Sequence, residues 1–104
     1  MAKFLFVYHG GDMPETEEEG QRVMAQWMSW LGGMGDAVVD GGNPIGMSST
    51  VNSDGSVTDN GGANPASGYS IISAASADEA QQLAKGCPIL EANGSVEIAE
   101  IIEM

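Results

Sequence analysis

The sequence predicts one α+β domain, in which helices cover one face of an antiparallel sheet. Two patterns support this fold class. Short apolar runs bounded by glycines indicate strands, and apolar residues at spacings of three and four indicate helices between them. The length of 104 residues and the apolar content of 42% suit a single globular domain, so we expect residues 1–104 to form one unit.

The first two elements are expected to be a buried strand and a long helix. Residues 3–8 form an apolar and aromatic run that closes at two glycines. A helix over residues 17–34 should follow, because the block of acids before it suits the positive end of a helix dipole. Its apolar face, which includes Trp27 and Trp30, is wider than one sheet contact needs. That width has two interpretations: a broad core face, or one tryptophan inside and one at an interface.

The middle of the chain is expected to hold a short strand and a hairpin. Residues 36–40 form a short strand-like run that a Gly-Gly-Asn-Pro turn stops. Thr50-Val51 and Val57-Thr58 flank an Asp-Gly pair, and Asp-Gly between β-branched residues is a hairpin signal. A loop rich in Gly, Asn and Pro then leads to the next apolar run.

The last third of the chain is expected to read strand, helix and strand. Residues 68–74 form the strand, and Ser76 with Glu79 makes a capping box that starts a short helix. A glycine and a proline end that helix. A last strand over residues 96–102 follows, and its alternation slips near Glu100, which indicates a bulge or an early end.

This order is the split βαβ plan of ferredoxin-like folds, βαββαβ, with an extra β-hairpin. Both helices of that plan cover the same face of the sheet. A domain of this size has no further layer for the other face. We therefore expect a second copy to cover it and the protein to be a homodimer.

Charge excludes several classes of partner. Fifteen Asp and Glu residues against three Lys and Arg residues give a net charge of −12. Phosphates repel such a chain, so neither nucleic acid nor an anionic membrane is an expected partner. The sequence shows no signal-type segment and no long apolar span, and we expect a cytoplasmic protein. The lone cysteine, Cys87, allows no intrachain disulfide, and we expect no cofactor.

The downstream half carries the most specific pattern in the chain. It consists of a GYSII-A strand, a DEA helix and a GCP stop, at residues 68–74, 78–80 and 86–88. Together with the apolar first strand, the acidic helix start and the closing Val-Glu-Ile, this pattern is similar to the YCII-related family, which includes the DGPF proteins. The resemblance covers nearly the whole chain. It implies a dimeric α+β barrel, in which two ferredoxin-like sheets close face to face around a central cleft.

The resemblance also implies candidate chemistry. Some family members are proposed enzymes with a histidine on the first helix and an aspartate after the first strand, and a few resemble muconolactone-type isomerases or dehalogenating lyases. Asp12 matches the aspartate, but Met24 stands near the place of the helix histidine. The DGPF segment is replaced by Asp-Asn-Gly-Gly at residues 59–62. The chain therefore lacks half of the dyad that the resemblance implies.

His9 is the only histidine and the one side chain suited to act as a general base near neutral pH. The two glycines after it let the chain turn back, so we expect Asp12 to orient the His9 ring and to raise its pKa. Tyr8 or Tyr69 would bind a ligand as a hydrogen-bond donor. The alternative for His9 is a structural strand-end residue that fixes the glycine loop. A metal site is not expected, because one nitrogen and scattered carboxylates have no diagnostic spacing.

Two functions remain open on the sequence alone. The first is a ligand-binding cleft between two copies, with weak or lost acid–base activity of the lyase or isomerase type on a small organic molecule. His9 and Asp12 would then be the catalytic pair. The second is a non-catalytic binding or protein-interaction module, in which the wide Trp/Met helix face serves a further partner. Whether His9 and Asp12 line a cavity separates the two.

Overall fold

The computed structural model describes residues 1–104 and contains the predicted elements in the predicted order. The strands and helices are β1 (Ala2–His9), α1 (Glu17–Met34), β2 (Val38–Asp40), β3 (Thr50–Val51), β4 (Val57–Thr58), β5 (Ala66–Ala74), α2 (Ala77–Ala84) and β6 (Ser95–Glu100). Two 3₁₀ turns, η1 (Gly35–Ala37) and η2 (Pro88–Ala92), precede β2 and β6. None of the helices combines the length and the apolar character that crossing a lipid bilayer requires.

Small differences from the predicted boundaries have local causes. Asp36 and Ala37 were predicted in a strand, but they belong to a 3₁₀ turn because Gly35, with a φ of 55°, redirects the chain before β2 begins. β6 ends at Glu100, which confirms the early end that the alternation indicated. Both helices begin at side-chain caps: Thr16 Oγ1 accepts from the Glu19 amide over 3.1 Å, and the predicted Ser76 cap is formed in the same way.

Four strands form one antiparallel sheet in the order β2-β5-β1-β6. β1 lies at the centre, with Leu5 opposite Ile71 of β5 on one side and opposite Ala99 of β6 on the other. β3 and β4 form a separate two-stranded hairpin. This arrangement is the ferredoxin-like split βαβ plan with an inserted hairpin, so the predicted fold of the single chain is confirmed.

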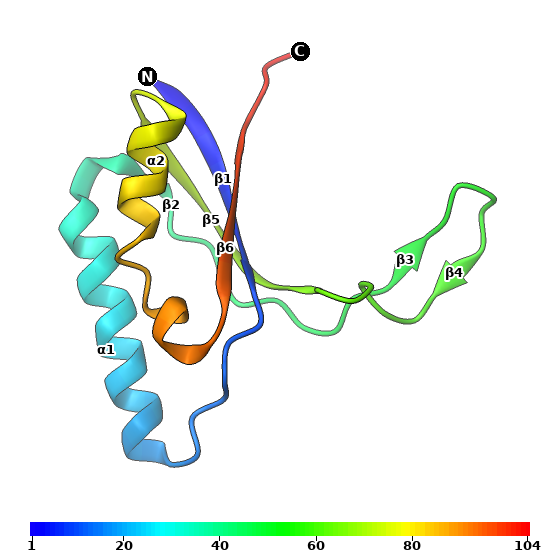
Figure 1. The fold of residues 1–104 in the computed structure, drawn as a ribbon, viewed down its shortest axis with the longest axis horizontal. Coiled ribbons are helices and arrows are strands. Elements are labelled where there is room, and N and C mark those ends of the chain that lie inside the picture. Colours follow the sequence, from blue (N-terminus) through cyan, green and yellow to red (C-terminus); the bar gives the residue numbers. More distant parts are fainter.

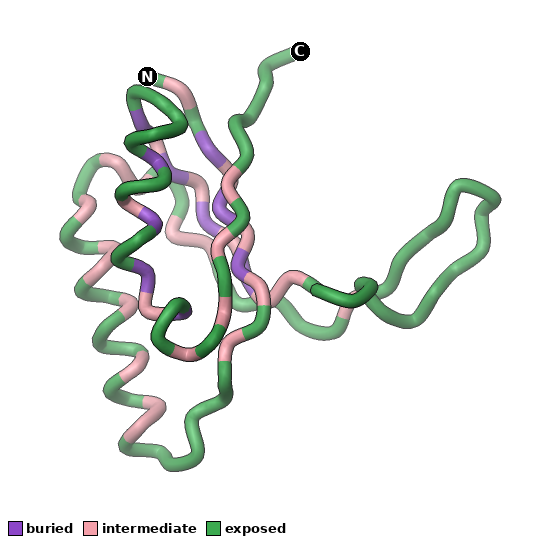
Figure 2. The backbone as a smooth tube through the Cα atoms, in the orientation of Figure 1, coloured by how far each residue is buried: buried purple, intermediate pink, exposed green.

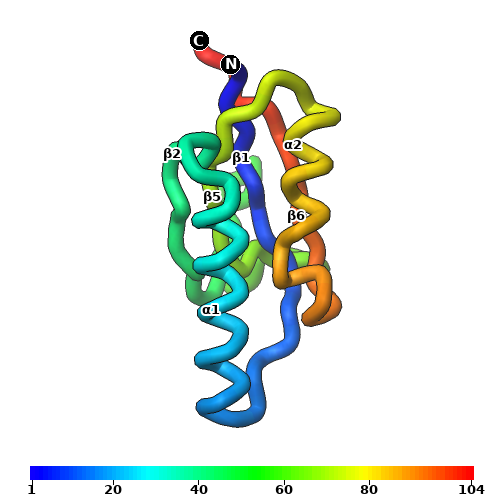
Figure 3. The backbone as a smooth tube through the Cα atoms, turned by 90° about the vertical axis from the view of Figure 1, so that its left-hand side faces the viewer, coloured from blue at the N-terminus to red at the C-terminus, as the bar shows by residue number.

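Both helices lie on the same face of the sheet (Figure 1, Figure 3). Side chains alternate along β1, so Phe4, Phe6 and Tyr8 are buried beneath the helices while Leu5 and Val7 face the other way. No layer covers that second side, which we call the open face. Strands β1, β5 and β6 contribute the side chains of Lys3, Leu5, Val7, His9, Tyr69, Ile71, Ser73, Ser95, Glu97 and Ala99, and β2 adds Asp40, which pairs with Ile71.

The core lies between the sheet and the two helices (Figure 2). The Tyr8 ring meets Trp27 edge to face, with centroids 4.8 Å apart, and Trp30 stacks with Phe6 at 6.4 Å. The Trp30 indole N–H donates to the Leu83 carbonyl oxygen over 3.0 Å and so joins α1 to α2. Both tryptophans pack on the core side, so the structure favours the broad core face over an interface tryptophan.

Residues 46–65, which include β3 and β4, form an arm that leaves the body of the domain (Figure 1). The arm projects on the side of the open face, away from both helices. Every residue from 49 to 65 is exposed (Figure 2). The Cα radius of gyration is 14.9 Å, against about 13 Å for a compact chain of this length, because the arm extends the molecule. The predicted hairpin is confirmed, with its turn at the tip of the arm.

Candidate functional site

The centre of the open face is apolar. Strand pairing sets its side chains in two adjacent rows: Tyr69, Val7 and Glu97 in one, and Ile71, Leu5 and Ala99 in the other. Leu5, Val7 and Ile71 are half-buried although no helix covers them. An antiparallel sheet with one solvated face usually turns polar side chains outward. This face departs from that pattern and has the character of a surface that another molecule covers.

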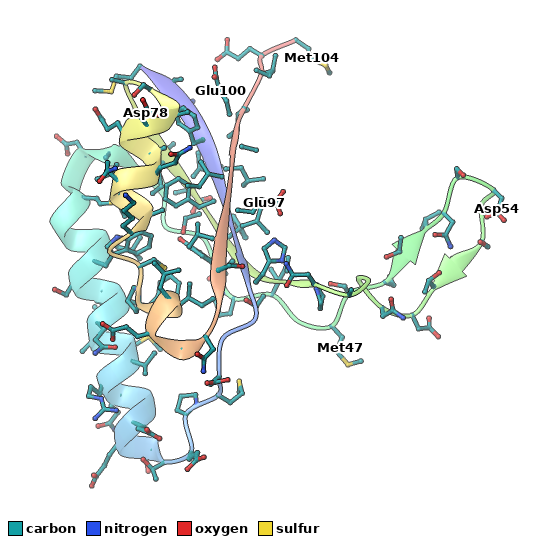
Figure 4. The ribbon with its side chains drawn as sticks, in the orientation of Figure 1. Met47, Asp54, Asp78, Glu97, Glu100 and Met104 are labelled. Carbon is teal, nitrogen blue, oxygen red and sulfur yellow. The ribbon has the colours of Figure 1, made fainter.

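His9 lies at one end of this apolar surface. It is the last residue of β1, and its side chain is only 11% exposed. Its Nε2 lies 2.8 Å from Oε1 of Glu97, and its Nδ1 lies 2.9 Å from the carbonyl oxygen of Asn64 at the root of the arm. Glu97 is 64% exposed and points toward the side of the arm, away from the helices (Figure 4). The His9 ring thus joins β1, β6 and the arm.

Both ring nitrogens of His9 face hydrogen-bond acceptors. A neutral imidazole has one N–H, so it donates either to the Asn64 carbonyl or to the Glu97 carboxylate, whereas the imidazolium donates to both. The hydrogen bond to Glu97 is the main cause that raises the His9 pKa above 6.5; burial opposes it, and backbone carbonyls add to it. The geometry therefore suits a charged His9 held between two acceptors. The predicted direction of the pKa is confirmed, with a different partner.

Asp12 does not reach His9. Its Oδ2 accepts a 2.6 Å hydrogen bond from the Asn93 side-chain amide, and its backbone N–H donates to the Ala92 carbonyl oxygen over 2.7 Å. These two bonds hold the loop after β1 against η2. The predicted pairing of His9 with Asp12 is therefore wrong: the carboxylate partner is Glu97, which the pairing of β1 with β6 brings alongside.

The two tyrosines lie on opposite faces of the sheet. Tyr8 is 4% exposed, and its hydroxyl donates over 2.7 Å to Ser70 Oγ, which in turn donates over 2.7 Å to the Gly41 carbonyl oxygen. Burial raises the Tyr8 pKa to about 12. The expectation that Tyr8 binds a ligand is corrected, since this side chain belongs to the core. Tyr69 lies on the open face, in the same row as Glu97.

Asp12 lines a separate groove with a volume of about 550 Å³. The loop after β1, the first half of α1 and η2 form its walls, with Arg22 and Trp27 among the lining side chains. His9 is not part of it, so this groove does not bring the two predicted catalytic residues together. Met24, near the place of the family's helix histidine, is 63% exposed and lies outside the groove.

Neither the surroundings of His9 nor the groove beside Asp12 holds a metal-binding cluster or a reactive nucleophile. No group of three or more His, Cys, Asp or Glu side chains is arranged to hold a metal ion. Cys87 is buried after α2, and burial raises its pKa to about 11. A thiol with that pKa is protonated near neutral pH, so Cys87 acts as a packing residue.

Comparison with known proteins agrees with the fold. The family model described as the YCII-related domain matches residues 4–104. The chain belongs to the YCII-related domain family. The matched residues include the open face beyond Lys3, the arm and the groove, so every feature of the site lies within the family domain. No match was found among curated proteins.

Among solved structures, the chain is similar to the 5-chloro-2-hydroxyhydroquinone dehydrochlorinase (TftG) of Burkholderia phenoliruptrix AC1100, in complex with 2,5-dihydroxybenzoquinone. The TM-score is 0.55 and the sequence identity is 17%. The match covers 96% of this YCII-related chain and 95% of the other. At this identity the likeness shows that the two proteins share a fold over nearly their full lengths.

Sequence reasoning missed two groups that contact His9. Glu97 carries a usable signal, because it alternates with Val96 and Ile98 and so faces away from the core. The ferredoxin-like order also places the last strand beside the first, and the two facts together predict an acid near the end of β1. Asn64 carries no such signal, since it contacts His9 through its backbone carbonyl and depends on the path of the arm.

Proposed function

We propose that this YCII-related domain binds a small organic molecule in a cleft between the open faces of two copies, where His9 and Glu97 act on it by acid–base chemistry. The observation that carries the proposal is the 2.8 Å ion pair between His9 and Glu97 on an apolar face that no layer covers. An apolar surface with a few convergent polar groups is the usual character of a ligand site.

The distribution of charge supports a second copy as the cover. Acids gather on the helix side, in the first turns of α1 and α2. The charged groups of the open face are Lys3, His9 and Glu97, with Asp40 of β2 opposite Ile71, so a protonated His9 leaves this face without net negative charge although the chain carries −12. Two copies that pair through it keep their acidic surfaces apart. The apolar rows around Leu5 would then form the buried centre of the interface.

The chemistry follows from the charged state of His9. A hydroxyl-bearing molecule that enters between the two side chains would give its proton to the Glu97 carboxylate, while the His9 Nε2–H donates to the oxyanion that forms. Tyr69, in the same row as Glu97, would donate a second hydrogen bond. In a substrate whose halogen lies on a saturated carbon conjugated with the hydroxyl-bearing carbon, the O–H bond pair would form a C=O bond while the C–halogen bond breaks and halide leaves, an elimination of the kind that the name dehydrochlorinase describes for TftG.

A non-catalytic binding role is the second candidate. It is favoured because His9 and Glu97 already bond to each other over 2.8 Å and His9 Nδ1 lies 2.9 Å from the Asn64 carbonyl oxygen, so a reacting hydroxyl would have to displace an existing hydrogen bond. In that role the imidazolium would hold the arm and attract a ligand with a weakly acidic hydroxyl. The cleft would be the same, and only turnover would be absent.

Calorimetric titration with 2,5-dihydroxybenzoquinone and with simple hydroquinones tests the proposal. We expect saturable binding that weakens about tenfold or more in His9→Gln and in Glu97→Gln, because each change removes a charge-assisted hydrogen bond. Asp12→Asn is the matched control and should bind as the wild type does. Release of chloride from a chlorinated hydroquinone would favour the enzyme, and binding without turnover would favour the non-catalytic role. Binding that survives both substitutions, or no binding of any of these compounds, would contradict the proposal.

A further inference from the structure

We infer that the arm is an exchange arm, which lies on the body of the second copy when the open faces pair. The inference rests on the pairing proposed above and extends it to a segment that the cleft itself does not require. Three observations carry it: the surface that the chain exposes, the internal order of the arm, and the direction in which it projects.

The accessible surface is too large for a self-contained domain. The chain exposes 7060 Å², whereas a folded monomer of 10.7 kDa exposes about 5,500 Å². The excess of about 1,500 Å² lies within the roughly 1,000–2,500 Å² that each partner buries in an obligate dimer. Only 11 of the 104 residues are buried. The single chain thus exposes about as much extra surface as a permanent dimer removes.

The arm supplies apolar surface that nothing in the chain covers. Met47, Val51 and Val57 are 99%, 72% and 61% exposed. Met47 lies at the root of the arm and Asp54 at its tip, and both stand clear of the sheet and the helices (Figure 4). An isolated hairpin of two strands is at best marginally stable in water, so this one requires contacts from outside the chain.

The arm is nevertheless built to keep its shape. The Asn52 side-chain amide donates to Ser56 Oγ over 3.1 Å and to Thr58 Oγ1 over 2.9 Å. The Asp54 carboxylate accepts from the amide and the hydroxyl of Ser56. These bonds make a preformed hairpin, and a preformed element loses little conformational entropy when it docks.

The direction of the arm identifies a second copy as the occupant. The arm leaves the domain on the side of the open face, where the sheet of a second copy would lie, and not over the helices (Figure 1). Its root is fixed beside that face, because His9 Nδ1 donates to the Asn64 carbonyl oxygen over 2.9 Å. A two-fold axis between paired open faces would direct each arm past its own sheet and toward the other copy.

Isotope-filtered NMR on an equal mixture of labelled and unlabelled protein tests the inference. We expect NOEs between the Val51 and Val57 methyl groups of one copy and protons of the other. The variant Val51→Asp/Val57→Asp should keep its fold, because both side chains are exposed, but should raise the dimer dissociation constant about tenfold or more. The matched control is Met24→Asp/Met28→Asp, on a helix surface with exposures of 63% and 67%, and it should leave the constant unchanged.

The possible results separate this inference from the proposed cleft. The inference would be overturned if the dimer gave no intermolecular arm NOEs and the arm variant had the dissociation constant of the wild type. The proposed pairing of the open faces would remain intact. Loss of probe binding with the arm NOEs present would overturn only the ligand proposal. A wild-type protein that stays monomeric at NMR concentrations would overturn both.

Discussion

The two faces of the sheet are built from the same strands but differ in how far their side chains are buried. On the helix side, Phe6 and Ile72 are 0% exposed and belong to one core cluster. On the open face, Leu5 and Ile71 are the adjacent residues of the same strands, yet they stay half-buried. The chain's own helices cover the first face, while the second also carries apolar side chains at its centre and no element of the chain covers it. Alternation in a strand therefore identifies a core only when the other face is polar.

Polar groups on the two faces differ in the same way. Ser70 is fully buried, and its hydroxyl both accepts from Tyr8 and donates to Gly41. No buried side-chain N or O atom in the chain lacks a hydrogen-bond partner. His9 is also nearly enclosed, but its partner Glu97 is 64% exposed. The helix-side network is a closed structural unit, whereas the His9 network is open to solvent on the Glu97 side.

Removing a core side chain should have the largest effect on stability. Phe6→Ala deletes a fully buried ring that stacks with Trp30, and such cavities cost about 3–5 kcal/mol. Urea unfolding should give the same loss at every protein concentration. Val7→Ala, one residue away on the open face, is the matched control. Its loss of unfolding free energy should become smaller as the protein is diluted, because only the proposed dimer covers Val7. If the two variants lost the same unfolding free energy at high dilution, the proposed difference between the two faces would be contradicted.

A charge at the centre of the open face should separate the two copies. Leu5 lies between Ile71 and Ala99, and Leu5→Asp would bury an unpaired carboxylate in each half of the proposed interface. The dimer dissociation constant should rise about ten-thousandfold, because each of the two unpaired buried charges costs about 3 kcal/mol or more. Sedimentation velocity measures the change, with Gln82→Asp on the exposed surface of α2 as control. A Leu5→Asp protein that still sediments as a dimer would exclude this face as the interface.

Most of the fold could be predicted because its signals are local. Helical periodicity and acidic residues at the start give the bounds of α1, and an Asp-Gly pair between β-branched residues gives the hairpin. The sheet order then follows from the split βαβ sequence of elements. The direction of the arm could not be predicted, because a hairpin without core contacts carries no hydrophobic pattern that orients it.

The site could be predicted only in part, because its contacts are long-range. His9 is noticeable as a lone histidine at a strand end, and proximity in sequence favours Asp12 as its partner. Asp12 instead bonds to Asn93, 81 positions away, and His9 bonds to Glu97, 88 positions away. Strand pairing and loop docking determine both contacts. The six residues around His9 carry no signal that predicts either one.

The hydroxyl groups of the two tyrosines should give a smaller contrast. Tyr8→Phe removes the donor to Ser70 inside the core and should cost about 1 kcal/mol in urea unfolding. Tyr69→Phe, on the open face, should stay within about 0.5 kcal/mol of the wild type. For binding of the probe compounds, measured by calorimetry, Tyr69→Phe should have the larger effect. Only Tyr69→Phe should weaken this binding. A Tyr8→Phe protein with normal stability and weak binding would place Tyr8 in the site after all.

The smallest effect should be a pH dependence that belongs to His9. The hydrogen bond to Glu97 raises the His9 pKa above 6.5 in the folded chain, so the folded state binds the proton more tightly than the unfolded state does. The ion pair therefore stabilises the fold fully below the unfolded pKa, and this stabilisation disappears as pH rises through the folded pKa. Its size should not exceed about 1 kcal/mol, because Glu97 is 64% exposed and solvent screens the pair.

Thermal unfolding between roughly pH 5.5 and 8.5 checks this dependence. The wild-type midpoint should fall with rising pH, and His9→Gln should show a flatter profile because the titrating ring is gone. Glu97→Gln should flatten the profile only in part, since His9 Nδ1 still donates to the Asn64 carbonyl oxygen. A slope that persists unchanged in His9→Gln would assign the titration to another group. In that case the ion pair would no longer distinguish the open face from the helix-covered one, and the acid–base role of His9 would lose its physical basis.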